Sequence, residues 1–266
     1  MGSNIKALRN RIKSVQSTLH LTRAMGLVAS SKVRKANENR IKSADFKNSV
    51  ATIINVLSSS TEAASSGYFG SKGEKTKIIL IAGDRGLAGG YNAGVLKLAK
   101  EHIAAEIYPI GKKACERYGK EAVSSEQFTY DDALSLANSL CAEFKGGELA
   151  RVGVIYTKYV SLMTQEPTLV WLLPLEKPEK SDTAGTIFEP SEKEALEAAI
   201  PTYVAGTIYS LIKESFACEV IARQNAMDSA GKNAEEMLDE LGLQYNRARQ
   251  GAITQEITEI VAGSGE

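Results

Sequence analysis

Proline is missing from both ends of this chain of 266 residues. All six prolines lie between Pro109 and Pro201, so the first 108 and the last 65 residues contain none. Proline removes a backbone donor and interrupts helices, so its absence permits uninterrupted helix in both segments. The two ends are therefore candidates for long helices.

Cysteine and histidine are also scarce. The three cysteines (Cys115, Cys141, Cys218) and two histidines (His20, His102) form no C-x-x-C pair and no spacing typical of zinc or haem sites. We therefore predict no metal and no cofactor, and we expect reduced, buried thiols. The G-x-S-x-G and H-E-x-x-H motifs of hydrolases are absent as well. Nothing in the sequence supports a catalytic site.

Long apolar runs are lacking too. None reaches the roughly 18–20 residues that would span a bilayer, and no secretory signal is present. The first 37 residues contain no acid and are rich in Lys, Arg and Ser, as in mitochondrial transit peptides. Their helical pattern continues past any plausible cleavage point, however. We expect no transit peptide and no direct insertion into a membrane.

Charge is balanced over the chain but not along it. Lysine plus arginine equal aspartate plus glutamate at 32 each, which argues against a general nucleic-acid binder. Residues 1–50 carry eleven basic and two acidic side chains, a net charge of +9. Residues 191–266 carry six basic and thirteen acidic side chains, a net charge of −7. Such ends attract either each other or outside partners of opposite charge.

Apolar residues at both ends alternate between steps of three and four, the seam pattern of a coiled coil. The two stripes consist of Ile5, Leu8, Ile12, Val15 and Leu19, and of Ala234, Leu238, Leu241, Tyr245, Ala248 and Ala252. Each segment spans about 55 residues, or on the order of 80 Å, so each needs a long partner. Matching length and opposite charge predict an antiparallel pair; two helices packed separately on a central domain are the alternative.

Between these ends, residues 76–200 alternate between strand and helix signals. Strand candidates lie at 77–82, 107–110, 151–157 and 168–173, and helix candidates at 92–105 and 131–144. This order favours a mainly parallel, doubly wound sheet, with an antiparallel hairpin as the alternative for 151–173. Pro190–Glu194 has the pattern of a capping box and predicts a short helix before the last long one.

The predicted fold class is α/β: a long antiparallel coiled coil of the N- and C-terminal helices with an inserted Rossmann-like domain. We expect an N-terminal coiled-coil helix over 1–66, an α/β foot domain over 67–203 and a C-terminal coiled-coil helix over 204–266. Small residues such as Ala234 and Gly231 in the C-terminal segment weaken a coiled coil because they bury little area. They suit a thin shaft that fits closely inside another structure.

A glycine-rich turn, Gly83-Asp84-Arg85-Gly86-Leu87-Ala88-Gly89-Gly90, follows the first predicted strand. Glycines at a strand-to-helix turn can hold phosphate at a helix N-terminus. This turn contains neither the G-x-G-x-x-G of dinucleotide-binding folds nor the Gly-Lys-Ser/Thr of a P-loop. We therefore interpret it as a structural tight turn.

A run of basic residues follows in the N-terminal helix: Lys32, Arg34, Lys35, Arg40, Lys42 and Lys47. It is either a solvated helix face or a surface for acidic partners. Aromatic side chains for base stacking are missing around it, which disfavours nucleic acid.

Three segments together resemble the gamma subunit of rotary (F-type) ATP synthases. These are Ile5–Val15 followed by Leu21–Met25 and Val28–Lys32; the turn Gly83–Asn92, similar to S-D-R-G-L-C-G-x-x-N with Gly83 and Ala88 as departures; and Tyr245–Val261, similar almost residue for residue. Gly251 and Ser264 stand where the family more often has alanine. The resemblance is strong at both ends and loose in the middle.

The resemblance implies a rotor shaft without a catalytic site of its own. Its implied partners are three alpha and three beta subunits around the shaft, with the epsilon subunit and the membrane c-ring at the foot. The shaft would couple ion flow through the c-ring to ATP synthesis or hydrolysis at the beta subunits. It would lie at the cytoplasmic face of a bacterial cell membrane.

The resemblance also implies contact residues. Arg249, Gln250, Thr254 and Glu256 would contact loops of the alpha/beta hexamer, with Met25 opposite on the first helix. Arg223 would act similarly, lower on the shaft. For the foot, the basic residues Arg34, Lys35 and Arg40 are expected contacts.

Two other functions stay open from the residues alone. A stand-alone α/β enzyme with helical arms would bind a nucleotide or other phosphate at Gly83–Gly90. A coiled-coil adaptor or nucleic-acid clamp would use the basic N-terminal helix and show a steep salt dependence.

Overall fold

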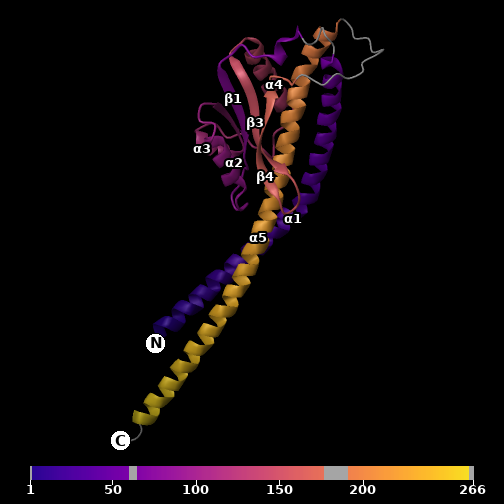
Figure 1. Cartoon of the computed structure of the whole chain (residues 1–266). Coiled ribbons are helices and arrows are strands. Elements are labelled where there is room, and N and C mark those ends of the chain that lie inside the picture. The colour runs from indigo at the N-terminus through magenta and orange to yellow at the C-terminus, as the bar shows by residue number, and fades with distance from the viewer. Residues whose placement is uncertain (1, 60–64, 177–190, 264–266) are drawn as a thin grey trace. The chain divides into compact units, whose positions relative to one another are not determined.

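The computed structural model describes residues 2–59, 65–176 and 191–263. The chain divides into two compact units: Met1–Ser30 with Arg223–Glu266, here called the helix-pair unit, and Ser31–Ala222, here called the sheet unit. Two long helices, α1 (Gly2–Ser58) and α5 (Glu192–Gly263), contribute to both units (Figure 1). Each unit is described by itself.

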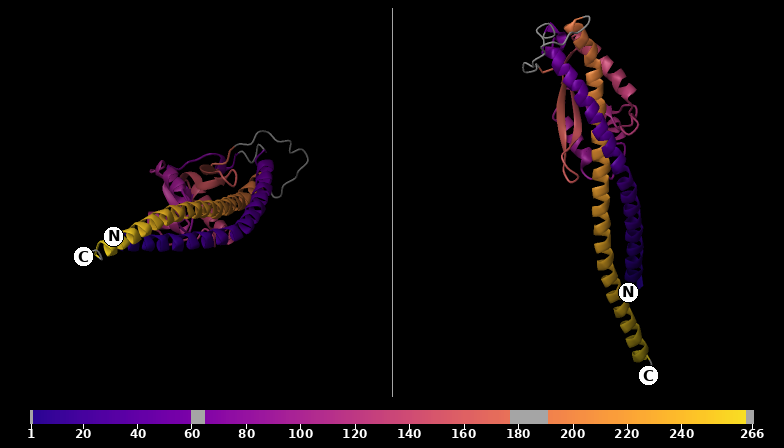
Figure 2. Two further views of the ribbon diagram at one scale, coloured as in Figure 1. Left: turned by 90° about the horizontal axis from the view of Figure 1, so that it is seen from below. Right: turned by 90° about the vertical axis from the view of Figure 1, so that its right-hand side faces the viewer.

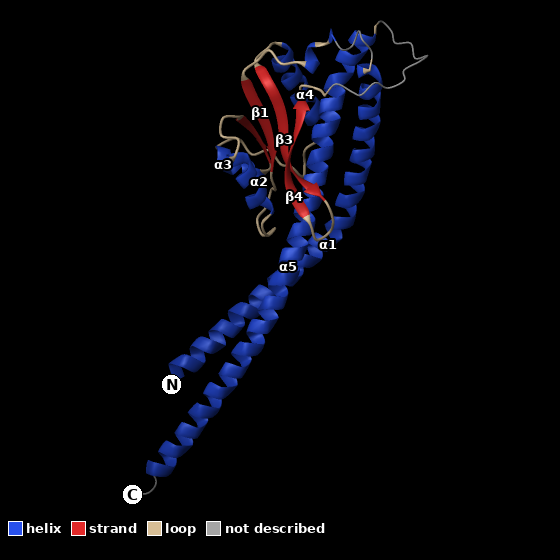
Figure 3. Ribbon diagram, viewed as in Figure 1, coloured by secondary structure: helices blue, strands red, loops and turns tan. Residues whose placement is uncertain are grey.

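A four-stranded mixed sheet forms the centre of the sheet unit (Figure 3). The strand order is β2 (Glu106–Ile110), β1 (Lys75–Ile81), β3 (Leu149–Tyr159) and β4 (Gln165–Leu173). Strand β1 pairs in parallel with both neighbours, whereas β3 and β4 pair antiparallel. The expected parallel pairing is therefore correct for β1, and the hairpin alternative is correct for β3 and β4.

Helices cover both faces of this sheet. Along β1, Ile79 and Ile81 join the larger core, which contains residues of α1, α4 (Tyr130–Lys145) and α5. Ile78 and Leu80 point the other way, into a smaller core with residues of α2 (Tyr91–Lys100) and α3 (Lys112–Tyr118). Successive strand residues point to opposite faces, so a run of four fully buried apolar residues needs helices on both sides.

Three details of the predicted elements are wrong. Helix α2 ends at Lys100 rather than near residue 105, and α3 was not predicted. No separate short helix precedes the last one, because α5 begins at Glu192 and continues through Pro201. Proline in a helix interior costs about 3 kcal/mol, but the neighbouring Ile200 and Val204 are fully buried in the core, and their burial offsets that cost.

The start of α5 is nevertheless capped as the sequence indicated. The backbone N–H of Glu194 donates to Ser191 Oγ at 3.2 Å, and the N–H of Ala195 donates to the Ser191 carbonyl at 3.0 Å. Pro190, the first residue of the predicted capping box, lies outside the described residues.

In the helix-pair unit, α1 and α5 run antiparallel along each other (Figure 2). Arg9 Nη2 donates to Tyr245 Oη at 3.0 Å, Arg23 pairs with Glu235, and Gly26 lies beside Met227. For each of these contacts, the residue numbers on α1 and α5 sum to about 254. The two antiparallel helices therefore keep one register along the pair.

The predicted seam positions are the shielded ones. Leu19, Ala234 and Leu241 are buried, whereas the other stripe residues are partly buried. Every residue between the stripe positions from 6 to 18 is exposed. The 3–4 spacing therefore identified the contact face correctly.

Small residues let the two helices approach closely. Gly26, Ala29, Gly231 and Ala234 are all buried in this unit. A Cβ built on Gly231 would lie 3.8 Å from Thr22 Oγ1, an ordinary contact. The seam is narrow and buries little apolar area per turn.

Helix α5 also contains an 18-residue window that is apolar enough, by length and composition, to cross a membrane. Within that window 56% of the residues are buried inside the protein. A core helix passes this test as readily as a spanning one, so the window is weak support for a membrane span.

Candidate functional site

The C-terminal segment of α5 carries most of the residues expected to contact a partner. Arg249, Gln250, Thr254 and Glu256 are all exposed. Since Arg9 lies beside Tyr245 and α1 begins at Gly2, the register leaves α5 without an opposing α1 residue beyond about residue 252. Thr254 and Glu256 therefore lie beyond the described part of α1, whereas Arg249 and Gln250 lie level with its first turn.

Apolar side chains share this segment, and the sequence reasoning missed them. Four of them, here called the apolar ridge, are 48–65% exposed: Ile253, Ile257, Ile260 and Val261. Their spacing of four and three places them along one face of α5. The sequence held part of the signal, because the three isoleucines repeat at steps of four and three. They do not continue the seam, whose next steps after Ala252 fall on Gln255 and Glu259.

We expected Met25 to lie opposite Arg249–Glu256, and the structure shows that it does not. Its neighbour Gly26 lies beside Met227 and Asp228, which places Met25 roughly 30 Å along the helix from Arg249 at 1.5 Å per residue. Met25 is level instead with the stretch just after Arg223, and both residues are partly buried. The structure thus separates the expected contacts into two levels of the helix pair.

The basic residues expected at the foot differ from one another. The Arg34 side chain is 91% exposed and Lys35 is exposed. Arg40 is partly buried, with its guanidinium 4.4 Å from the centroid of the Tyr159 ring and its Nε donating to Asn37 Oδ1. Arg34 and Lys35 are exposed to solvent, although Arg34 Nε lies 3.7 Å from Glu38 Oε1 one turn along α1. Arg40 instead stabilises the packing of α1 on the end of β3.

The glycine-rich turn is held by Asp84, which accepts four hydrogen bonds. Oδ1 accepts from the backbone N–H groups of Lys112 and Ser125, and Oδ2 accepts from Ser124 Oγ and the N–H of Glu126, at 2.6–3.1 Å. Burial raises the pKa of the Asp84 carboxyl, but the hydrogen bonds outweigh burial and lower it overall. Asp84 therefore ties the turn to the start of α3 and to residues 124–126.

Asn92 and Tyr91 fix the other end of the turn. Asn92 Oδ1 accepts from the N–H of Gly83 at 2.8 Å, and its Nδ2 donates to the Arg85 carbonyl at 3.2 Å. Buried Tyr91 donates its hydroxyl to the Ser215 carbonyl on α5 at 2.9 Å. The turn is a rigid connection between the sheet and α5.

Two positions of the turn are sterically constrained: Gly83 has no room for a side chain, and Leu87 has a positive φ. A Cβ on Gly83 would lie 2.7 Å from Glu219 Cδ of α5, closer than real contacts allow. At the tip, Leu87 has a φ of 59° and a side chain that is 60% exposed. A positive φ costs a non-glycine residue about 1–2 kcal/mol, so the fixed ends of the turn impose this conformation.

In the described part of the chain, no group of three or more His, Cys, Asp or Glu side chains is able to hold a metal. The three cysteines are buried, and burial raises the pKa of Cys141 to about 11 and that of Cys218 to about 12. The thiols of Cys141 and Cys218 are therefore protonated near neutral pH and unreactive.

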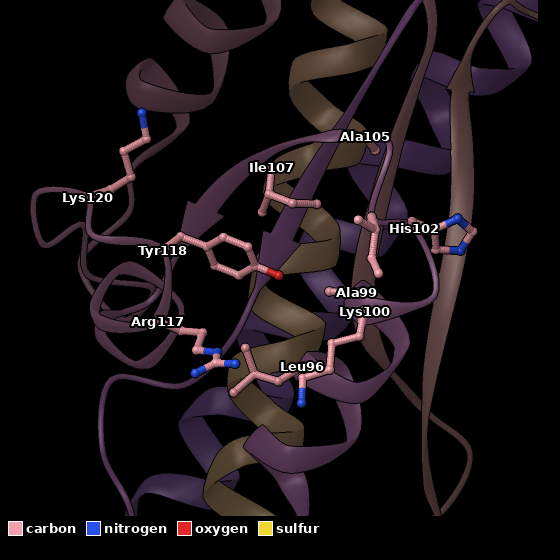
Figure 4. A pocket seen from close by; sticks show the side chains of 10 residues that line it. Leu96, Ala99, Lys100, His102, Ala105, Ile107, Arg117, Tyr118 and Lys120 are labelled. Carbon is pink, nitrogen blue, oxygen red and sulfur yellow. The ribbon is translucent and has the colours of Figure 1, made fainter.

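A pocket of about 430 Å³ lies between α2, β2 and α3 (Figure 4). Its basic residues include Lys100 and Arg117, which belong to the last turns of α2 and α3. Cations there complement the negative ends of the two helices. His102 and Lys120 point away from this pair in Figure 4, so the polar groups do not converge on one ligand.

Comparison with known proteins identifies the family. The sequence model of the ATP synthase family matches residues 4–265. The chain is 43% identical to the ATP synthase gamma chain of Ruminococcus albus, over 98% of both chains. It is 38% identical to the sodium ion specific ATP synthase gamma chain of Acetobacterium woodii, over 99% of both.

The chain belongs to the ATP synthase gamma-chain family. Gamma chains are non-catalytic subunits that form the central stalk, or rotor shaft, of ATP synthase. Membership explains why the described residues present long exposed helix surfaces and a braced turn rather than a reaction centre.

Solved structures of the family share this fold. The central stalk and c-ring structure of Tetrahymena thermophila mitochondrial ATP synthase contains a chain with a TM-score of 0.62 and 20% identity, covering 79% of this chain and 99% of that one. A chain in the OSCP/F1/c-ring structure from Euglena gracilis has a TM-score of 0.69 and 16% identity, covering 99% and 94%. This chain thus shares its fold, long terminal helices with an inserted mixed sheet, with chains in solved ATP synthases.

Proposed function

We propose that this gamma chain turns inside a hexamer of three alpha and three beta subunits and couples ion flow through a membrane c-ring to ATP synthesis or hydrolysis at the beta subunits. The observation that carries the proposal is the apolar ridge at the end of α5, together with the exposed polar residues beside it. Water-exposed isoleucines in a row mark an interaction surface. Their place on α5, beyond the residues that pair with α1, supports a partner that contacts α5 from outside.

The proposed contacts lie at two levels. Arg249, Gln250, Thr254 and Glu256 contact the hexamer around the apolar ridge, whereas Met25 and Arg223 contact it further along the pair. An asymmetric pair of helices presents a different face to each beta subunit. Differential contact of this kind shifts each nucleotide site between states without any chemistry on the shaft.

The proposed foot contacts are the epsilon subunit and the c-ring, with Arg34 and Lys35 as exposed cations on the sheet unit and Arg40 as a positioning residue behind them. As a functional division we keep helical arms over 1–66 and 204–266 and a foot over 67–203. The proposed location is the cytoplasmic face of a bacterial cell membrane, peripheral to the bilayer. A ring of acidic or polar partner groups would complement these cations.

Assembly tests the rotor role directly. The chain is co-expressed with alpha and beta subunits of the same organism, and the mass of the complex and its ATPase activity are measured. We expect one copy per three alpha–beta pairs and a loss of activity when residues 245–266 are deleted. Elution of the chain alone, with alpha and beta indifferent to it, would refute the proposal.

A matched pair of substitutions tests the apolar ridge. Ile257→Asp introduces a charge on the ridge, where we expect at least a tenfold loss of ATPase activity in the assembled complex. Ile103→Asp makes the same change at a residue of the sheet unit that is 88% exposed and is expected to have no effect. Equal activities of the two variants would remove the ridge from the interface.

A second pair tests Met25. We expect Met25→Lys to retain the fold but loosen the coupling between ATP hydrolysis and ion transport in membrane vesicles. Met163→Lys, at a hairpin residue that is 82% exposed, serves as the control. Unchanged coupling in the first variant would count against a contact at Met25.

A further inference from the structure

A second pocket of the sheet unit has a different character from the one in Figure 4. It has a volume of about 460 Å³ and is lined by residues of three helices: Asn39, Lys42, Ser43 and Phe46 of α1, Tyr130 of α4, and Tyr209 and Lys213 of α5. All seven belong to the sheet unit. The volume lies within the range of pockets that hold small molecules.

Three aromatic rings form one wall of this pocket. Phe46 and Tyr130 meet edge to face with centroids 5.6 Å apart, and Tyr130 meets Tyr209 in the same way at 6.0 Å. Each ring therefore fixes the next. Phe46 reaches the wall because α5 carries glycine opposite it: a Cβ on Gly206 would lie 2.9 Å from Phe46 Cε1. The wall is preformed and offers ring faces and edges to a planar ligand.

Lys213 supplies a cation that the protein does not neutralise. Its Nζ donates to the Phe128 carbonyl at 2.8 Å and lies 4.8 Å from the centroid of the Tyr209 ring. Among the described residues that line the pocket there are two lysines and no carboxylate. Burial lowers the pKa of Lys213, and no acidic group counteracts this. A partly buried ammonium without a counter-ion is stabilised by any anion that reaches it.

We propose that this pocket binds a small aromatic carboxylate, with the planar body against Phe46, Tyr130 and Tyr209 and the carboxylate between Lys213 and Lys42. The aromatic wall explains the planar body, and the two lysines explain the negative charge. The occupant contacts α1, α4 and α5 together and so braces the two long helices within the sheet unit. None of its lining residues is among those proposed to contact the alpha/beta hexamer.

The experiment uses the full chain and two probes of nearly the same shape, one a carboxylate and the other a neutral amide. Binding of 2-naphthoate and of its uncharged counterpart 2-naphthamide is measured by isothermal titration calorimetry. We expect one molecule of 2-naphthoate per chain, with a Kd on the order of 0.1–1 mM for a ligand of this size. The amide is expected to bind at least tenfold more weakly. Equal binding of the two probes would overturn the role of the lysines.

Variants locate the site. We expect Lys213→Met to weaken 2-naphthoate at least tenfold and Lys42→Gln about threefold, because Lys42 is exposed and screened by water. Lys100→Gln, in the pocket of Figure 4, is the matched control and is expected to change nothing. If circular dichroism shows that Lys213→Met does not fold, the Lys42→Gln variant and the comparison with 2-naphthamide still test the proposal. Loss of binding in Lys100→Gln, or full binding in Lys42→Gln, would overturn the proposal.

Discussion

The two units of this chain are stabilised to very different degrees by burial. In the sheet unit, both faces of β1 are fully buried, and the core includes residues of α1, α4 and α5. In the described part of the helix-pair unit, the buried apolar side chains are Leu19, Ala29, Met227, Ala234 and Leu241. Fully burying a Leu or Ile stabilises by about 1.5–3 kcal/mol, so the sheet unit holds most of the stability. The helix-pair unit is narrow and less stabilised by burial, and the isoleucines near the end of α5 are exposed.

We expect the largest loss of stability from a substitution in the sheet unit, at Gly111. This residue has a φ of 93°, and a Cβ there would lie 1.9 Å from the Ala82 carbonyl oxygen. We expect Gly111→Ala to lower the free energy of unfolding by about 3 kcal/mol or more, because backbone must move. Gly119→Ala is the control: its φ is 62° with open space around it, so it should cost only about 1 kcal/mol. Urea unfolding compares the two, and equal losses would contradict the steric account.

A smaller effect concerns Asp84 and depends on pH. The folded-state pKa of this carboxyl is lowered, so its stabilisation is present above the unfolded value of about 3.9 and is lost as pH falls through the folded pKa. We expect Asp84→Asn to cost about 1–2 kcal/mol at pH 7, because Asp84 is partly exposed and water weakens its charge-assisted hydrogen bonds.

Urea unfolding at a series of pH values checks this prediction. The difference between Asp84→Asn and the parent chain should shrink below pH 4. A pH-independent difference would mean that the carboxylate charge is not what holds the turn.

The same substitution on the same helix sharpens the comparison between the units. Gly231→Ala, in the helix-pair unit, meets only ordinary contacts at 3.8–4.0 Å, so we expect it to stabilise the pair by about 0.5–1 kcal/mol through helix propensity. Gly206→Ala, in the sheet unit, forces Phe46 to move, which cancels or reverses that gain. Hydrogen exchange of α5 amides measures both. A loss of protection in Gly231→Ala would show that the seam tolerates no extra methyl group.

The smallest effect is expected at the Arg23–Glu235 ion pair of the helix-pair unit. Both side chains are about half exposed, at 58% and 48%, and exposed pairs contribute little. We expect Arg23→Ala to change the stability of the pair by about 0.5 kcal/mol or less, and less still in 1 M salt. A double-mutant cycle with Glu235→Ala measures the coupling. A coupling above 1 kcal/mol would mean that charge, rather than the seam, holds the helices together.

Elements with a repeating apolar pattern could be predicted from the sequence, whereas short elements and local departures from the usual residue preferences could not. The seam from Ile5 to Leu19 could be read because 3–4 spacing has one physical meaning over several turns. Helix α3, with seven residues, is too short for such a pattern. Proline signals a helix break, yet the core around Pro201 overrides it. The hairpin of β3 and β4 stayed one of two alternatives, because pairing direction depends on contacts distant in sequence.

The functional surfaces divide in the same way. Arg249 and its neighbours were found through resemblance, whereas the apolar ridge required the register between α1 and α5. The pocket at Lys213 could not be predicted, because its lining residues come from three helices that only the fold brings together.

The pairing of Arg9 with Tyr245 joins residues 236 positions apart, which has a consequence for how the chain is made. At about 5–20 residues per second, the ribosome needs roughly 10–50 s to produce the partner of the first helix. The sheet unit can begin to form during that interval, but the apolar stripe of α1 stays uncovered until the end of α5 has been synthesised. A transcript truncated by a few dozen codons would thus release a nascent chain whose first helix never finds its partner.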